Sequence, residues 1–404
     1  MKIRTLTKTL FAIGLTSSVV ASHAAELRVN GFASVVGGRT ISDSKEASDT
    51  ILAPGVLDAD STYTVTPAFS GDPDSSSYDD DLSFKPETNM GLQLSADLGG
   101  NLSITAQLTA QGANDFDAEI EWLYVSYDIN NNLNLKGGRQ RIPFYFYSDY
   151  LDVGYAYHWI RPPQDVYSLS FSTYEGVSLT YNGSIDLWDT SLQTYYGALD
   201  TDTGPFGQLD FTDLWGFVLS GSNDWLELRL SYHHMDVEAP DATAAVPTRP
   251  FSPGNEEVFD YTSFGVKANF GNLFMGIEYA LSGLGEPAAV NPFNETGFQD
   301  GNDWYITAGY RMGAWTPHIT FSSSETENES EDFDGNGIVS ASTEDGKDSA
   351  TETWILGVRY DFHPSAALKL EYTDRSEESD TEVQAIRGEP GEVSTFAVGI
   401  DVIF

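Results

Sequence analysis

The chain has 404 residues, with 61 acidic residues, 20 basic residues and no cysteine. The lack of cysteine excludes disulfides, thiolate metal sites and cysteine nucleophiles. A formal net charge of −41 argues against nucleic acid as a partner, because phosphate binding depends on clustered Lys and Arg. No apolar stretch approaches the roughly 20 residues that a helix needs to cross a bilayer, so a helical membrane protein is also excluded.

Residues 1–24 have the pattern of a secretory signal peptide. Three bases precede a short apolar stretch at residues 10–20, and Ser-His-Ala at residues 22–24 forms a small-x-small cleavage site. We therefore expect the protein to be exported, with residues 25–404 as a single mature domain.

From residue 26 onward, apolar residues alternate with polar or small ones over segments of about ten residues, the length of a tilted strand that crosses a bilayer. For example, Trp304, Ile306 and Ala308 fall on one face of a strand, and Tyr305 and Thr307 fall on the other. The pattern predicts strands with one apolar and one polar face, at about 26–38, 86–98, 101–113, 118–129, 133–142, 172–182, 187–199, 212–222, 225–236, 259–270, 272–283, 303–313, 315–325, 351–362, 366–376 and 392–404.

The connections between these strands are alternately short and long. A soluble β-sandwich also alternates in polarity, but it has no reason to sort its loops into two populations. Short turns such as Gly99-Gly100 and Gly271-Asn272 contrast with long acidic segments such as 39–85 and 326–350. The sequence therefore predicts an all-β protein, a transmembrane antiparallel up-and-down β-barrel of about 16 strands, with short periplasmic turns and long acidic outer loops.

The third long connection, residues 143–171, is rich in Tyr and Trp. An exposed segment of this composition would form a large apolar patch in water. We expect the loop to pack against the inside of the barrel and narrow its lumen. The alternative is a packed outer cap that leaves the lumen open.

Most of the few basic residues lie on the polar strand faces, where they would line a lumen. Opposed rings of basic and acidic side chains determine ion preference in channels, and we expect this preference to be decided at the constriction. The alternative is that each base pairs with a neighbouring acid, and strict alternation gives Arg139 and Arg141 no single facing. The candidate residues at the lumen or constriction are Lys136, Arg139, Arg141, Asp149, Asp152, Arg161, Arg229, Lys267, Arg311 and Arg359.

One outer loop has the spacing of a calcium ligand set. Asp332, Asp334 and Asn336 occupy alternate positions, and glycine follows at the sixth position. The match fails at the twelfth position, where Thr343 replaces the expected glutamate. A calcium site and a solvated acidic loop both remain open, and no other cofactor is expected.

The final strand ends in Phe404. Together with the leader and the sixteen alternating segments, this ending resembles Gram-negative porins, whose C-terminal aromatic residue is read by the barrel assembly machinery. The run Gly-Gly-Arg-Gln-Arg-Ile-Pro-Phe at residues 137–144 is similar to a segment of the phosphate-selective and dicarboxylate porin branch. The chain departs from that branch after Phe144, so the substrate class does not carry over. The resemblance implies a homotrimer in the outer membrane whose third loop folds inward.

These features predict an outer-membrane porin through which small hydrophilic solutes and ions diffuse passively. A plugged barrel acting as an adhesin or surface receptor is the alternative, and single-channel conductance would separate the two. The histidines lie in no catalytic motif, so no enzyme is expected. The rings of residues 143–171 make a sugar path conceivable, because rings stack on pyranose faces, although the same rings could simply pack.

Overall fold

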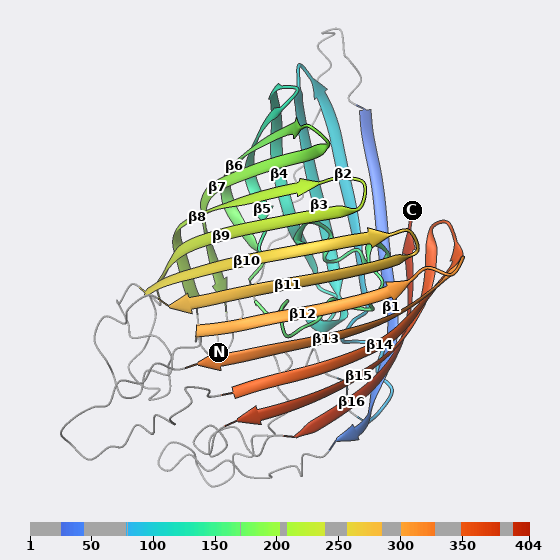
Figure 1. The fold of residues 1–404 in the computed structure, drawn as a ribbon. Helices are drawn as coiled ribbons and strands as arrows, with labels where there is room; N and C mark the ends of the chain where they lie inside the picture. Colours follow the sequence, from blue (N-terminus) through green and yellow to red (C-terminus); the bar gives the residue numbers. More distant parts are fainter. Residues whose placement is uncertain are drawn as a thin grey trace, which may run out of the picture.

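The computed structural model describes residues 26–43, 78, 80–169, 171–202, 208–238, 257–284, 300–327, 349–379 and 391–404. Sixteen antiparallel strands form a closed barrel in which each strand pairs with its neighbours in the chain and β16 pairs with β1 (Figure 1). The predicted all-β up-and-down barrel is confirmed. The strands are β1 Glu26–Asp43, β2 Asn89–Gly99, β3 Leu102–Gln111, β4 Ala118–Asn130, β5 Leu133–Arg141, β6 Thr173–Ile185, β7 Trp188–Asp202, β8 Gln208–Ser222, β9 Leu226–Glu238, β10 Glu257–Phe270, β11 Leu273–Leu284, β12 Asp300–Tyr310, β13 Trp315–Glu327, β14 Ser349–His363, β15 Ala366–Ser379 and β16 Glu392–Ile403.

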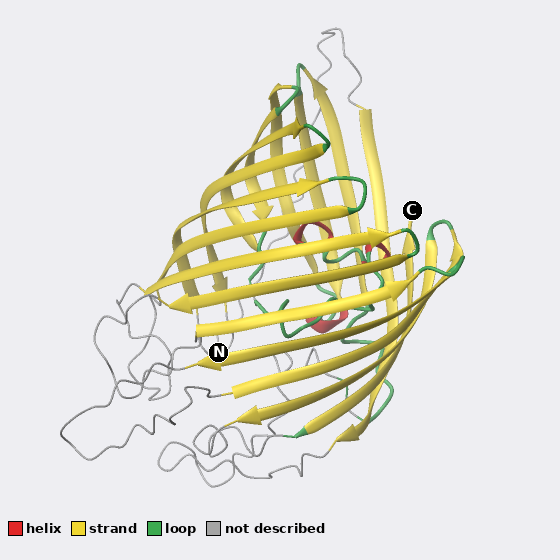
Figure 2. Ribbon diagram, viewed as in Figure 1, coloured by secondary structure: helices red, strands yellow, loops and turns green. Residues whose placement is uncertain are grey.

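The described helices are three short 3-10 turns, η1 Gly112–Asn114, η2 Ser148–Tyr150 and η3 Gly154–Ala156 (Figure 2). No helix among the described residues is long and apolar enough to cross a membrane. The expected signal peptide lies outside the described residues.

The alternation of the sequence becomes the two faces of the barrel wall. On β11, Met275 and Ile277 point outward and are exposed, whereas Glu278 and Ala280 point inward and are buried. The register continues this division, because Ile277 pairs with Ile306 of β12 and directly opposed residues share a face. Closure pairs the backbone groups of every strand, which is the condition for a sheet to span lipid.

The short turns of the described chain lie together at one end of the barrel (Figure 1). At the short-turn end, positive φ values occur at turn residues such as Gly271 (φ 64°) and Gly313 (φ 63°), where glycine adopts this conformation without strain. The long β5–β6 connection enters the barrel (Figure 2).

An apolar core fills part of the barrel interior, where the alternation predicts a polar lining. Phe211 and Leu214 of β8 and Met235 of β9 point inward and are fully buried. They form one cluster with Phe144 and Phe171 from the two ends of the β5–β6 loop. These wall residues can be apolar because the loop covers them and keeps water away.

Two leucines of β8 provide a matched test of this internal core. Leu214 points inward with 0% exposure, whereas Leu219 points outward with 48% exposure. Leu214→Ala should lower the free energy of unfolding by about 2–5 kcal/mol, because it opens a cavity in a packed core, and Leu219→Ala should cost less. Denaturant titration of the barrel in lipid vesicles measures both losses. Equal losses in the free energy of unfolding for the two variants would contradict the packing of Leu214 in a core inside the barrel.

Candidate functional site: the loop inside the barrel

The β5–β6 loop, residues 142–172, crosses the interior and contacts walls that are distant in the sequence. The indole N–H of Trp159, which has 0% exposure, donates to Thr320 Oγ1 of β13 at 2.8 Å. A Cβ on Gly154 of η3 would lie 2.5 Å from Ser34 Oγ of β1. The loop therefore lies within the barrel and is not an outer cap.

Basic side chains on the inner wall donate to the backbone carbonyls of this loop. A buried irregular segment cannot pair its carbonyls within itself, so it needs donors from elsewhere. Arg229 of β9 supplies them where the loop begins, since its guanidinium donates to the carbonyl of Pro143 and, at 3.0 Å, to that of Phe144. Ser231 and Ser263 complete its partners.

A second part of the wall, at β14 and β15, holds the middle of the loop in the same way. Arg359 of β14 and Lys369 of β15 are directly opposed in the sheet register. Lys369 also forms an ion pair of 2.8 Å with Asp401 of β16. The donated hydrogen bonds run from Arg359 Nη1 to the carbonyls of Tyr155 and Tyr157, both at 2.7 Å, and from Lys369 Nζ to the carbonyls of Gly154, at 2.7 Å, and Trp159.

Inward carboxylates accept the complementary hydrogen bonds. Glu278 of β11 is fully buried and accepts from the backbone N–H of Phe146 at 2.8 Å and from the hydroxyl of Tyr167 at 2.6 Å. Glu371 of β15 accepts from the backbone N–H of Ile160 at 3.1 Å. These charged wall residues, of both signs, thus act as hydrogen-bond partners of the loop.

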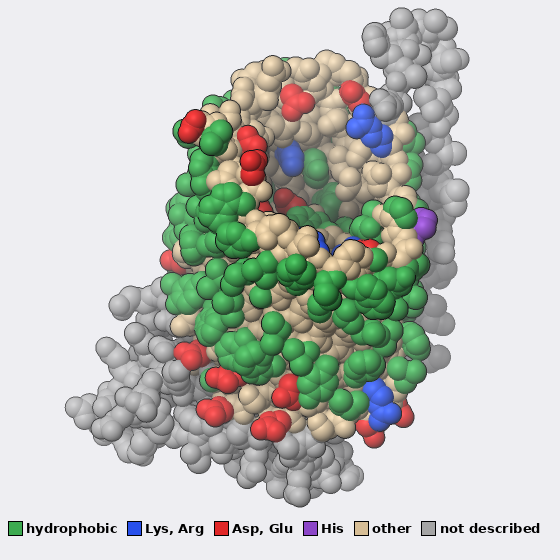
Figure 3. Space-filling view, turned by 45° about the vertical axis from the view of Figure 1, so that its right-hand side comes forward, with side chains coloured by type: hydrophobic (Ala, Val, Ile, Leu, Met, Phe, Trp, Pro, Cys, Tyr) green, Lys and Arg blue, Asp and Glu red, His purple; other side chains and the backbone are tan. Residues whose placement is uncertain are grey.

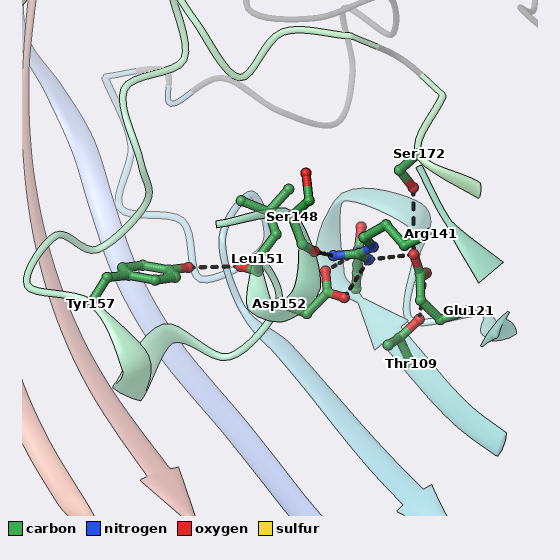
Figure 4. Close-up of polar contacts among 9 residues, drawn as sticks. Thr109, Glu121, Arg141, Ser148, Leu151, Asp152, Tyr157 and Ser172 are labelled. Carbon is green, nitrogen blue, oxygen red and sulfur yellow. Dashed lines mark hydrogen bonds and ion pairs between the residues drawn. The ribbon is translucent and has the colours of Figure 1, made fainter. Parts of the chain in front are cut away.

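A buried ionic cluster closes the base of the loop (Figure 4). The Arg141 guanidinium, at the end of β5, pairs with Glu121 of β4 and with Asp152 of the loop, the latter at 2.6 Å. It also donates to the carbonyl of Ser148 at 3.0 Å, while Ser172 Oγ donates to Glu121 at 3.4 Å. One cluster therefore ties the first and last parts of the loop to the wall. Burial raises the pKa of Asp152 above its ordinary value, and Arg141 opposes this shift.

Three predicted bases, Lys136, Lys267 and Arg311, point inward and, within the described part of the chain, donate no hydrogen bond to the loop backbone. Each lies over aromatic rings instead. The contacts are Lys136 over Tyr124 (5.0 Å), Lys267 over Phe146 (3.9 Å) and Tyr147 (3.8 Å), and Arg311 over Phe274 (4.9 Å).

The three predicted charged residues of the loop also differ in whether another side chain or carbonyl engages them. Asp149 is exposed, whereas Asp152 is buried in the Arg141 cluster. Arg161 donates to the carbonyl of Pro86 at 3.1 Å and lies 3.8 Å from Glu87, which joins the loop to the segment before β2. Of these three residues, only Asp149 remains placed to meet a passing ion.

Arg139 faces the outside of the barrel, which corrects the expectation that it lines the lumen. The register sets it opposite Leu123 of β4 and Glu175 of β6, and Leu123 is an outward, exposed residue. Arg139 Nη1 lies 3.8 Å from Glu175. Alternation alone explains this facing, because Arg139 lies three positions after the inward Lys136 and the pairing of β5 with β6 has no register shift.

The predicted metal ligands Asp332, Asp334 and Asn336 lie outside the described residues. Within the part of the chain that the structure describes, no group of three or more His, Asp or Glu side chains could hold a metal ion. The residues that sequence reasoning did not assign to the site are those that hold the loop, above all Glu121, Glu278, Lys369 and Glu371. The sequence feature that could have identified them is an ionisable residue in the middle of a predicted strand, on its inward face.

Arg141 is the cation that neutralises both Glu121 and Asp152. Arg141→Met leaves these two buried carboxylates without a cation and should destabilise the docked loop by about 3–5 kcal/mol. Adding Glu121→Gln and Asp152→Asn should recover most of the loss. The rate of limited proteolysis within residues 142–172 measures how far the loop is released from the barrel wall.

The pH dependence follows from the raised pKa of Asp152. A carboxyl whose pKa is raised in the docked state favours docking when protonated, so its contribution is present at acidic pH and is lost as the pH rises through that pKa. Arg141→Met should therefore release the loop more at neutral than at acidic pH. Greater release in acid would contradict this reading of the cluster.

Comparison with known proteins agrees with this architecture. Solved structures with similar folds include outer-membrane-expressed OmpT of Vibrio cholerae (TM-score 0.56, 11% identity, covering 96% of this chain and 100% of that chain). The outer membrane channel DcaP of Acinetobacter baumannii (0.55, 11%, 94% and 97%) and OmpF of Salmonella typhi in complex with daunomycin (0.55, 14%, 94% and 97%) are also similar. No curated protein sequence matches. The sequence model of the Gram-negative porin family matches residues 9–380, and the chain therefore belongs to the Gram-negative porins.

Proposed function

We propose that the β5–β6 loop is the constriction of this porin, an outer-membrane channel for the passive diffusion of small hydrophilic solutes. The observation that carries the proposal is the set of charge-assisted hydrogen bonds from Arg229, Arg359 and Lys369 to the loop backbone. A loop held from both walls narrows the lumen permanently. Passage then depends on pore width and lumen charge, without energy coupling, a cofactor or a catalytic step.

Ion preference follows from the charges that the loop leaves free. We assign it to Lys136, Lys267 and Arg311 on the wall, and to Asp149 on the loop. At the constriction, where a passing ion is partly dehydrated, these charges interact with the ion strongly. At the solvated outer mouth, dissolved salt screens charges beyond about 8 Å at physiological ionic strength.

We further propose a homotrimer. One solved structure of OmpT of Vibrio cholerae is described as a trimer form. In this chain, the outward faces of β1 to β3 carry no aromatic side chain and include Ala33, Ala96 and Ala106, whereas outward aromatic residues such as Trp215 and Trp354 lie on later strands. Small residues allow close approach of two walls, so this side of the barrel is the proposed contact between protomers.

The proposal also includes recognition of the C-terminus by the assembly machinery and kinship with one porin branch. The backbone N–H of Gly31 donates to the carbonyl of Phe404 at 2.7 Å and the N–H of Phe404 donates to the carbonyl of Gly31 at 2.9 Å, so the end of the chain lies against β1, where the barrel closes. This position supports recognition of Phe404 by the barrel assembly machinery. The similarity of residues 137–144 to the phosphate-selective and dicarboxylate branch supports kinship only.

Recordings in planar bilayers test the channel and its selectivity together. The wild type should give stepwise conductance, and the triple variant Lys136→Met, Lys267→Met and Arg311→Met should move the reversal potential under a salt gradient towards cations. Arg139→Met removes the same charge from the outer face and is the matched control.

Two results would contradict the proposal. Absence of stepwise conductance would favour the rival function, a plugged barrel that acts as an adhesin or receptor. An equal shift in the reversal potential for Arg139→Met would show that lumen placement does not decide selectivity.

A further inference from the structure

We propose that His158 of the β5–β6 loop and His318 of β13 form a proton-sensitive contact, which releases the middle of the loop from the barrel wall in acid and so narrows the open lumen. The inference rests on the proposed constriction and names how that constriction is regulated. The two rings meet where Arg359 and Lys369 hold the loop backbone, so a charge gained at the rings acts directly on the docking of the loop.

The contact joins the loop to four neighbouring strands. The His158 and His318 rings meet edge to face, with centroids 4.6 Å apart and planes at 76°. His158 Nε2 lies 3.2 Å from Thr307 Oγ1 of β12, and the ring also packs against Phe274 of β11, with centroids 4.8 Å apart. His318 is buried over Gly357 of β14, where an added side chain would collide with the imidazole. The position of the loop therefore depends on how these two rings pack.

Protons can reach the pair from the water of the lumen. His158 itself is partly exposed. The hydroxyl of Tyr155, three residues earlier, donates to the carbonyl of Pro364 in the β14–β15 turn at 2.8 Å, which places this part of the loop towards the short-turn end. Figure 3 shows a hollow at that end, with basic and hydrophobic side chains inside it. The pH of the lumen therefore sets the protonation of the pair.

The charges around the pair oppose its protonation. The ionisable residues on the surrounding faces are Tyr157 of the loop, Glu278 of β11, Tyr305 of β12 and Arg311 directly after it, Arg359 and Asp361 of β14, Lys369 and Glu371 of β15, and Asp401 of β16. Glu278 and Glu371 accept from the loop backbone. Asp361 and Asp401 form ion pairs of 2.8 Å with the wall bases of β14 and β15. On these described faces, each carboxylate already has a partner, and a charged imidazole would meet cations.

The pKa of His158 reflects these surroundings. Burial lowers this pKa well below its ordinary value, and repulsion from His318 and the wall cations lowers it further. His318 Nδ1 has no hydrogen-bond partner among the described residues, so a charged ring there would leave a buried N–H unpaired. A group whose pKa is lowered by docking stabilises the docked state while it is neutral. This contribution is present above the ordinary pKa of about 6.5 and is lost as the pH falls below it.

Release affects the middle of the loop and leaves its base in place. The carbonyls on either side of His158, those of Tyr157 and Trp159, accept from the wall bases, so a shift of His158 breaks both contacts. The base stays docked, because the raised pKa of Asp152 favours docking in acid. Inward residues of β5 to β7, such as Gln193, are partly exposed, so the freed segment has room on that side and narrows the lumen there.

Recordings of the full-length chain in planar bilayers test the inference. In 1 M salt, which screens the exposed carboxylates, the single-channel conductance should fall reversibly as the pH is lowered from 7.5 to 5, with a midpoint below about 6.5. A conductance that stays constant over this range would overturn the inference and leave the channel intact. Absence of conductance at pH 7.5 would instead remove the proposed channel function itself.

Removal of both imidazoles identifies the groups that titrate. The double variant His158→Gln with His318→Gln should lose the fall in acid, when its conductance is compared with its own value at pH 7.5. His234→Gln is the matched control, because His234 faces outward on β9 and bonds to Asp260 at 2.8 Å. A fall that persists in the double variant, or that disappears in the control, would overturn the inference.

A change of one neighbouring charge covers the case in which the double variant does not fold. Arg311 lies over Phe274, which packs against His158. Arg311→Met removes a cation that opposes protonation in the docked state, so the midpoint should move to lower pH by about 0.5 unit, the effect of one partly screened charge. Lys136→Met removes an equal lumen charge on the far side of the barrel and should leave the midpoint in place. Equal shifts in both variants, or a shift to higher pH for Arg311→Met, would overturn the inference.

Discussion

The backbone carbonyls of the β5–β6 loop must find hydrogen-bond donors inside the barrel, and the rest of the interior is organised around this requirement. An irregular segment that leaves water cannot satisfy its own peptide groups, and an unpaired buried carbonyl is costly. Arg229, Arg359 and Lys369 meet the need from two walls. A chain with only 20 basic residues thus places several of them in the middle of strands.

The same requirement explains why the inner wall is not uniformly polar. Once the loop is held, it shields part of the wall from water, and residues such as Phe211 and Met235 can pack against Phe144 and Phe171. Apolar packing and charge-assisted hydrogen bonds therefore support one another. The lumen that remains for solutes is bounded by the surfaces that the loop leaves uncovered.

Strand positions were largely predictable from the sequence, because a lipid-facing wall imposes a period of two over a set length. The predicted strands 225–236 and 272–283 correspond to Leu226–Glu238 and Leu273–Leu284. The inward facing of Arg229 follows from the same alternation. Its partners do not, because Phe144 lies 85 residues away and the contact depends on the path of an irregular loop. The lumen assignment of Arg139 was wrong because it departed from the alternation, which places Arg139 on the opposite face from Lys136.

The central claim, that the loop is docked across the interior, can be tested by cross-linking, since the natural chain contains no cysteine. A Cβ on Gly154 would lie 2.5 Å from Ser34 Oγ and 2.4 Å from Asp401 Oδ1, so Gly154→Cys and Ser34→Cys bring two thiols together once the Asp401 carboxylate turns aside, and their disulfide would join the loop to β1. The account predicts that the disulfide forms in the membrane-inserted barrel and that the single-channel conductance is the same before and after its reduction. A pair that stays unlinked under oxidising conditions, or a conductance that changes markedly on reduction, would contradict it.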